Sequence, residues 1–111
     1  MPTPAVEVLS AIPLFRRVSL EDRERVAGVS SLHSYERGDH AFHQDDPSDF
    51  FFIVVTGQIK VYRHSPDGHD VILEIFGPGG PLGAVAAYES RPYPASAAAI
   101  EPASCLLIPR T

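Results

Sequence analysis

The fold of this chain is decided by residues 50–76, which read FFFIVVTGQIKVYRHSPDGHDVILEIF. Three runs rich in β-branched and aromatic residues occupy 50–55, 59–63 and 71–76, and turns containing Gly57 and Asp67-Gly68 separate them. This pattern predicts consecutive antiparallel strands, because glycine and Asp-Gly suit tight turns. The first run is apolar on both faces, so we expect it to form the most buried strand. Any antiparallel meander would share the pattern, which by itself indicates no function.

The composition predicts one globular domain over residues 1–111, a length that buries roughly two thirds of the unfolded surface. Eleven prolines and eight glycines favour short strands and many turns. The net charge is −5 and Lys60 is the only lysine, which argues against nucleic-acid binding by these residues themselves. Cys105 is the only cysteine, so it cannot form an internal disulfide, which suits a reducing cytoplasm. Its apolar neighbours indicate that it is a buried small apolar residue. No segment is long and apolar enough to predict a membrane span.

Two short helices are expected before the strands. The first candidate covers residues 5–11, and the proline at position 13 ends it. Ser19 opens the second, since its hydroxyl can cap the backbone and Asp22 three residues later gives a variant of the capping box. We expect Gly28 to end this second helix.

Further strands are predicted on both sides of the central stretch. Residues 29–35 form one, with Leu32 and Val29 facing the interior. Residues 40–43 form a short strand, whose alternation would point His40 and His43 to opposite faces. Later elements are a constrained glycine–proline loop at 77–81, a helical segment over 82–88 and strands over 95–100 and 104–108. The total is about eight short strands.

Five stretches of the chain occur in an order and spacing that indicate a family. The strongest is 46–63, DPSDFFFIVVTGQIKVYR, which follows Asp45. The others are the segments 9–15, 35–39, 76–79 and 106–110. Together they resemble the cyclic-nucleotide-binding domain of the Crp/Fnr bacterial transcription regulators, whose strongest line is GDPADxLYIVxSGxVKVYR, so Asp45 stands where a glycine is usual. The resemblance implies an eight-stranded antiparallel jelly roll with a short helix over a pocket between two sheets.

The residues that bind the nucleotide in that family form a cassette, and this chain departs from it. The resemblance implies a pocket made by Gly83, Ala84, Val85, Ala86, Arg91, Pro94, Ala95 and Ser96. Ala84 stands where the family has a carboxylate for the ribose, and Pro94 stands where it has an arginine for the phosphate. Because each charge-assisted hydrogen bond is worth about 1.5–3 kcal/mol, we expect no tight cyclic AMP binding of the usual kind.

Three alternatives stay open for the pocket. A cyclic nucleotide could bind through Arg91 and free backbone amides, although Arg91 and Glu89 are more simply exposed loop charges. Haem is a second occupant, since some family members that sense gases or redox state bind it and depart from the cassette in this way. A metal-dependent cupin-type enzyme is the third, but the spacing of His40 and His43 does not match the HxH pair of cupins. We expect no catalytic residues and no metal ligands.

The resemblance also implies how such a domain acts. In the family, the last strand leads into a dimerising helix and a helix-turn-helix that reads DNA. The chain ends at Thr111, before such a helix would start, so it is either an effector domain taken from a longer parent or a stand-alone module. We expect the first, with a homodimeric parent. The predicted function is effector sensing, in which a small molecule bound in the jelly roll controls DNA binding by a C-terminal domain. The identity of the effector is left open.

Overall fold

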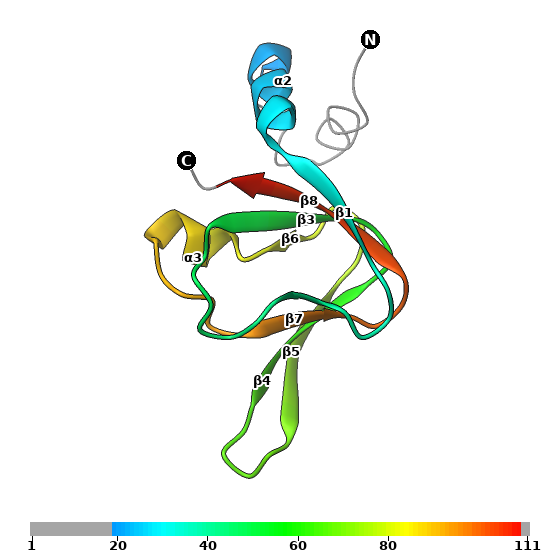
Figure 1. The fold of residues 1–111 in the computed structure, drawn as a ribbon, viewed down its shortest axis with the longest axis vertical. Helices are drawn as coiled ribbons and strands as arrows, with labels where there is room; N and C mark the ends of the chain where they lie inside the picture. The colour runs from blue at the N-terminus through cyan, green and yellow to red at the C-terminus, as the bar shows by residue number, and fades with distance from the viewer. Residues whose placement is uncertain (1–18, 110–111) are drawn as a thin grey trace.

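The computed structural model describes residues 19–109, which form two four-stranded antiparallel sheets packed face to face (Figure 1). The first sheet has the order β1-β8-β3-β6 and the second has the order β2-β7-β4-β5. The strands are β1 (Ser31–Tyr35), β2 (His40–Phe42), β3 (Phe50–Thr56), β4 (Ile59–His64), β5 (Asp70–Phe76), β6 (Pro81–Leu82), β7 (Ser96–Ala99) and β8 (Ala103–Pro109). The helices are α2 (Leu20–Val29) and α3 (Ala84–Glu89). This arrangement confirms the predicted mainly β jelly roll; the helix expected over residues 5–11 lies outside the described residues.

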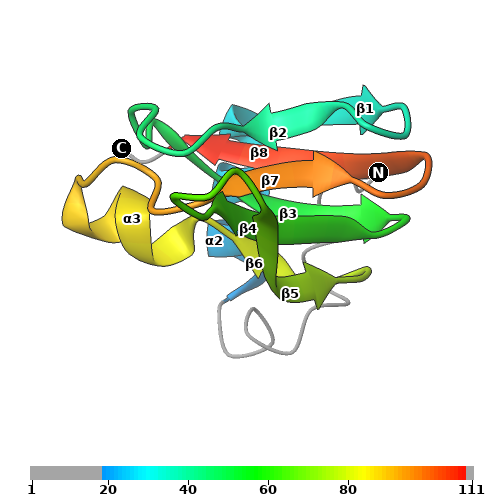
Figure 2. The same ribbon diagram turned by 90° about the horizontal axis from the view of Figure 1, so that it is seen from below.

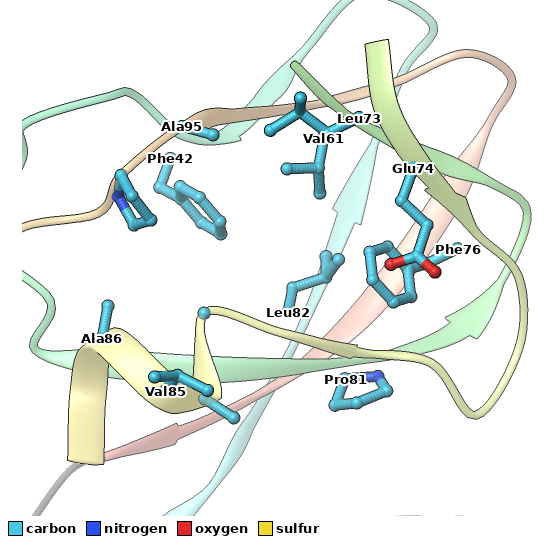
Figure 3. A pocket seen from close by; sticks show the side chains of 13 residues that line it. Phe42, Val61, Leu73, Glu74, Phe76, Pro81, Leu82, Val85, Ala86 and Ala95 are labelled. Atoms are coloured by element: carbon cyan, nitrogen blue, oxygen red, sulfur yellow. The ribbon is translucent and has the colours of Figure 1, made fainter. Parts of the chain in front are cut away.

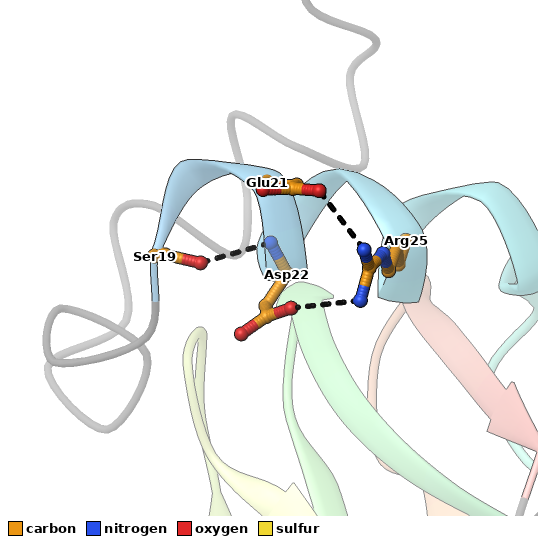
Figure 4. Close-up of polar contacts among 4 residues, drawn as sticks. All are labelled: Ser19, Glu21, Asp22 and Arg25. Atoms are coloured by element: carbon orange, nitrogen blue, oxygen red, sulfur yellow. Dashed lines mark hydrogen bonds and ion pairs between the residues drawn. The ribbon is translucent and has the colours of Figure 1, made fainter.

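Helix α2 begins where the capping pattern predicts. The Ser19 hydroxyl accepts a hydrogen bond from the backbone N–H of Asp22 at 3.1 Å, which satisfies one of the unpaired amides of the first turn (Figure 4). Arg25 forms ion pairs with Glu21 at 2.9 Å and with Asp22 at 3.4 Å. These side chains are exposed, so the pairs add little to stability.

The end of α2 differs from the prediction. The helix ends at Val29 rather than Gly28, and Ser30 is its cap. The backbone N–H and the hydroxyl of Ser30 both donate to the Ala27 carbonyl, at 3.3 and 3.0 Å, so no glycine in a left-handed conformation is needed there. The predicted strand over 29–35 therefore starts two residues later, at Ser31.

The side of β1 that faces the interior was also predicted wrongly. Leu32 is 56% exposed and Val29 is 60% exposed. Side chains alternate along a strand, and His33 pairs with the buried Cys105 of β8 while Tyr35 packs against the core. The odd-numbered residues of β1 therefore face the other sheet.

The core lies between the two sheets, and a smaller cluster lies under α2. The main cluster includes Phe42, Phe52, Val54, Ile59, Leu82, Tyr93, Cys105 and Leu107. The smaller cluster packs Ala27 of α2 against Ile53, Leu106 and Ile108 on the outer face of the first sheet. Strand β3 is therefore buried on both faces at 52–54, but the prediction that it is the most buried strand is wrong. All four residues of β7 are buried, whereas the ends of β3 extend past its two-residue neighbour β6 and are exposed.

Two turn positions show why the family pattern places glycine in them. Gly57, between β3 and β4, has φ 76°, and a Cβ there would lie 2.3 Å from the carbonyl oxygen of Pro102. Asp45 has φ 73° although it is not glycine. Aspartate tolerates this left-handed region better than most residues, so the chain keeps the glycine conformation without the glycine.

The arrangement of His40 and His43 corrects another prediction. Their rings do not point to opposite faces; they stack, with centroids 4.2 Å apart and an interplanar angle of 18°. Strand β2 ends at Phe42, and its register against β7 shifts between His40 and Phe42. Strict alternation therefore does not extend to His43.

Within the described part of the chain, no helix is long and apolar enough to span a membrane.

Candidate functional site

A cavity of about 420 Å³ opens between the β4–β5 hairpin, β6, α3 and the start of β7 (Figure 3). The lining side chains are mostly apolar: Phe42, Val61, Leu73, Glu74, Phe76, Pro81, Leu82, Gly83, Ala84, Val85, Ala86, Pro94 and Ala95. Glu74 is the one charged residue among these described lining residues. A large apolar cavity with few polar groups is the usual form of a small-molecule site.

Strand alternation places Glu74 on the cavity side of β5, like Phe76, and a β-bulge adds Leu73 beside it. In the ladder between β4 and β5, Val61 pairs with Glu74 and the next residue, Tyr62, pairs with Ile72. Leu73 is therefore an extra residue without a partner on β4. A bulge of this kind re-aims side chains, and both Leu73 and Glu74 line the cavity. Figure 3 shows the Glu74 carboxylate beside the Phe76 ring.

Gly83 allows α3 to approach the aromatic wall. It has φ 71° and is the N-cap of α3. A Cβ at this position would lie 2.7 Å from Cε1 of Tyr93. The Tyr93 ring is held in place, because it stacks on Phe42 with centroids 3.9 Å apart and its hydroxyl donates to the carbonyl of Phe50. Burial raises the pKa of Tyr93 above its usual value, so the phenol stays a neutral donor.

Six of the eight residues predicted for the pocket line this cavity: Gly83, Ala84, Val85, Ala86, Pro94 and Ala95. Arg91 does not line it. Its side chain is 76% exposed and its Nε lies 3.3 Å from Oε2 of Glu89. Ser96 does not line it either, because it pairs with Tyr62 on β4 and its hydroxyl accepts the backbone N–H of Gln44 at 2.9 Å.

The remaining lining residues were not predicted. They come from β2, β4, β5 and β6: Phe42, Val61, Leu73, Glu74, Phe76, Pro81 and Leu82. The one signal in the sequence was Glu74, a single charge inside the apolar run 71–76. Such a charge also suits an exposed edge strand, so the sequence alone does not reveal that Glu74 lines a cavity.

Ser48 is a further residue that sequence reasoning missed. It is 3% exposed and comes from the polar loop before β3. The single proton of its hydroxyl is shared between the carbonyls of Ala86, at 3.0 Å, and of Arg91, which belong to α3 and to the loop that follows it. The hydroxyl therefore fixes α3 over the cavity.

The chemistry of the lining residues limits what can bind. The lining residues that the structure describes include no lysine, arginine or histidine, so a phosphate would find no cationic partner among them. They also include no cysteine, methionine or tyrosine, which together with histidine are the side chains that ligate haem iron. The cavity therefore does not fit haem. Among residues 19–109, no three His, Cys, Asp or Glu side chains come together in a way that could hold a metal ion.

A family model and two named relatives of this chain indicate the same kind of domain. The family model described as "Cyclic nucleotide-binding domain" matches residues 32–111. The chain is 29% identical over 94 residues to a CRP-like cAMP-activated global transcriptional regulator of Mycobacterium tuberculosis, covering 85% of this chain and 42% of that protein. It is 30% identical over 91 residues to a cAMP-dependent protein kinase regulatory subunit of Mycosarcoma maydis, covering 82% of this chain and 17% of that protein. The chain thus spans less than half the length of these relatives.

Solved structures show the same similarity. The N-terminal domain of a transcriptional regulator from Streptomyces coelicolor superposes with a TM-score of 0.82 at 30% identity, over 92% of this chain and 73% of that one. The sensor domain of the transcriptional regulator DNR from Pseudomonas aeruginosa superposes with a TM-score of 0.86 at 25% identity, over 94% of this chain and 70% of that one. Because the family model covers most of the chain and the fold agrees, this chain belongs to the cyclic nucleotide-binding domain family and is similar to the sensor domains of CRP-like transcription regulators.

Proposed function

We propose that this chain is the effector-binding domain of a Crp/Fnr-type transcription regulator, and that its effector is a small, largely apolar molecule without a negative charge. The observation that carries the proposal is the composition of the 420 Å³ cavity, in which Glu74 is the one charged lining residue among those described. A carboxylate repels anions and favours a neutral or cationic group. The effector would shift the balance between two states of a homodimeric, cytoplasmic regulator whose DNA-binding part lies elsewhere.

Cyclic nucleotides fit this cavity poorly for a quantitative reason. Ala84 and Pro94 both line it, at the two positions where the resemblance places the carboxylate and the arginine. Each missing charge-assisted bond is worth about 1.5–3 kcal/mol, so the two together lower affinity by about 10²- to 10⁴-fold. A ligand bound by apolar contact loses nothing through these replacements.

Isothermal titration with cyclic AMP and cyclic GMP tests the exclusion of nucleotides. We expect no saturable heat from the wild-type chain. The double variant Ala84→Glu with Pro94→Arg should gain binding of cyclic AMP, because it restores both anchors at the cavity wall. Micromolar binding by the wild type would contradict the proposal.

A neutral apolar fluorophore, N-phenyl-1-naphthylamine, tests the positive half of the proposal. Val85 lines the cavity and is 72% exposed, so Val85→Trp should fill the entrance without disturbing the core. Tyr88→Trp is the matched control, because Tyr88 is on the same helix, is 90% exposed and does not line the cavity. We expect the fluorescence gain to fall for Val85→Trp and to persist for Tyr88→Trp. Equal gains for both variants would show that the probe binds elsewhere.

A second candidate function is cyclic-nucleotide binding through Arg91 and backbone amides. It is favoured by the M. tuberculosis relative, which is described as cAMP-activated. In this structure Arg91 is exposed and paired with Glu89, so it would have to turn inward on binding. If the wild type binds cyclic AMP, Arg91→Ala should abolish the binding and Arg25→Ala should not. Unchanged affinity in Arg91→Ala would reject this second function.

A further inference from the structure

The outer face of the second sheet carries a separate hollow of about 250 Å³. It lies over β2, β7 and β4, which are neighbours in that sheet (Figure 2). The strand register sets His40 opposite Ala98 and Ala98 opposite Lys60, so these three residues form one row. The short side chain of Ala98 leaves a depression between the two longer ones. The apolar cavity is on the other face of this sheet, so the sheet separates the two sites.

Basic groups converge on this hollow. Arg37, from the turn before β2, lines it together with His40 and Lys60. The buried ring of Tyr62 forms part of the floor: its hydroxyl lies 2.5 Å from Nε2 of His40, and Nζ of Lys60 lies 4.8 Å from its ring centroid. Neither Arg37 nor Lys60 forms an ion pair with any carboxylate in the described range 19–109. Two permanent cations thus line one concavity in a chain of net charge −5.

We propose that this hollow, formed by Arg37, His40 and Lys60, binds the phosphate group of a small molecule. A guanidinium and an ammonium are the side chains that proteins use most for phosphate, the first as a planar donor fork and the second as a point charge. His40 adds a third positive charge to the hollow once it is protonated. The hollow is small and open, which suits a phosphate head group rather than a whole nucleotide.

The groups around His40 make phosphate binding dependent on pH. Burial lowers the pKa of His40, and the neighbouring His43, Lys60 and His64 lower it further, while Asp39 acts in the opposite direction. Without a ligand, His40 is therefore neutral near neutral pH. A bound dianion stabilises the protonated imidazole, so the affinity rises as the pH falls.

Two-dimensional NMR titration with inorganic phosphate, at constant ionic strength set with chloride, tests the proposal. We expect saturable shifts at the amides of His40, Lys60 and Ala98. Lys60→Met should weaken binding about fivefold, the factor that corresponds to about 1 kcal/mol for a partly exposed charge, and Arg37→Gln should act similarly. Arg25→Gln, which removes a cation of α2 outside the hollow, should leave the affinity unchanged. Diffuse, non-saturating shifts, or equal affinity in all variants, would overturn the proposal.

Two further titrations separate the sources of the anion and isolate His40. Glycerol 3-phosphate should bind as inorganic phosphate does; binding of the inorganic ion alone would indicate an adventitious ion and would overturn the proposal. Sulfate stays a dianion across the range, so its affinity should be higher at about pH 5.5 than at about pH 8 through protonation of His40. His40→Gln should remove this difference, and a difference that persists in His40→Gln would contradict the role given to this residue.

Discussion

Replacement of Gly83 by alanine tests how closely the start of α3 must approach the rings of Tyr93 and Phe42. The left-handed backbone at this position costs a residue with a Cβ about 1 kcal/mol. The added Cβ would also lie 2.7 Å from Cε1 of Tyr93 and 3.6 Å from Cε2 of Phe42. Tyr93 cannot yield cheaply, because stacking and its hydrogen bond to the Phe50 carbonyl hold the ring. Overpacking a rigid site costs about 1–3 kcal/mol more, so we expect a total loss of about 2–4 kcal/mol.

Gly79→Ala is the matched control for this substitution. Gly79 has φ 86° and lies on the other side of β6, but a Cβ there would have no atom within 4 Å. The Gly79→Ala variant should therefore lose only about 1 kcal/mol of unfolding free energy, which is the cost of the left-handed backbone. Urea unfolding followed by circular dichroism gives both free energies, and the difference between them is the contribution of the contact with Tyr93. If Gly83→Ala loses no more stability than Gly79→Ala, the explanation by close packing is wrong.

Three further predictions concern the loop that holds α3, the strained turn and the core thiol. Ser48→Ala should lower the unfolding free energy by about 1–3 kcal/mol, because the carbonyl of Arg91 loses the hydroxyl that contacts it, whereas the carbonyl of Ala86 keeps the backbone N–H of Arg91 at 3.0 Å. Faster amide exchange in α3 than in α2 would show that the loss is local. Asp45→Gly should raise the urea midpoint, since φ 73° suits glycine, while a lower midpoint would mean that the carboxylate contributes more than the strain costs. Burial raises the pKa of Cys105 to about 12, so the folded domain should react with a thiol reagent only as fast as it unfolds, and rapid labelling at neutral pH would contradict the buried position.

The local elements were predictable because their causes are local. Alternating β-branched residues, the turn at Gly57 and the cap at Ser19 each depend on a few neighbouring residues, and the structure contains all three. The order of the motifs along the chain then predicted the jelly roll. The predicted orientations of the β1 side chains and of His40 and His43 were wrong, because they depend on strand register. Pairing with β8 sets the register of β1, and pairing with β7 sets that of β2.

The sequence by itself thus predicted the turns, the family and every strand except β6, which lies where a loop over 77–81 and a helix over 82–88 were expected. Only the tertiary structure decided which other residues line the cavity together with Ala84 and Pro94. Glu74 lines the cavity because it pairs with Val61 on the inner side of the second sheet, and a β-bulge adds Leu73 beside it. Ser48 contacts α3 although they are far apart in the chain. Lys60 and His40 share a hollow because β7 lies between their strands. Strand order, register and bulges are set by the packing of the whole core, which no short segment of sequence contains.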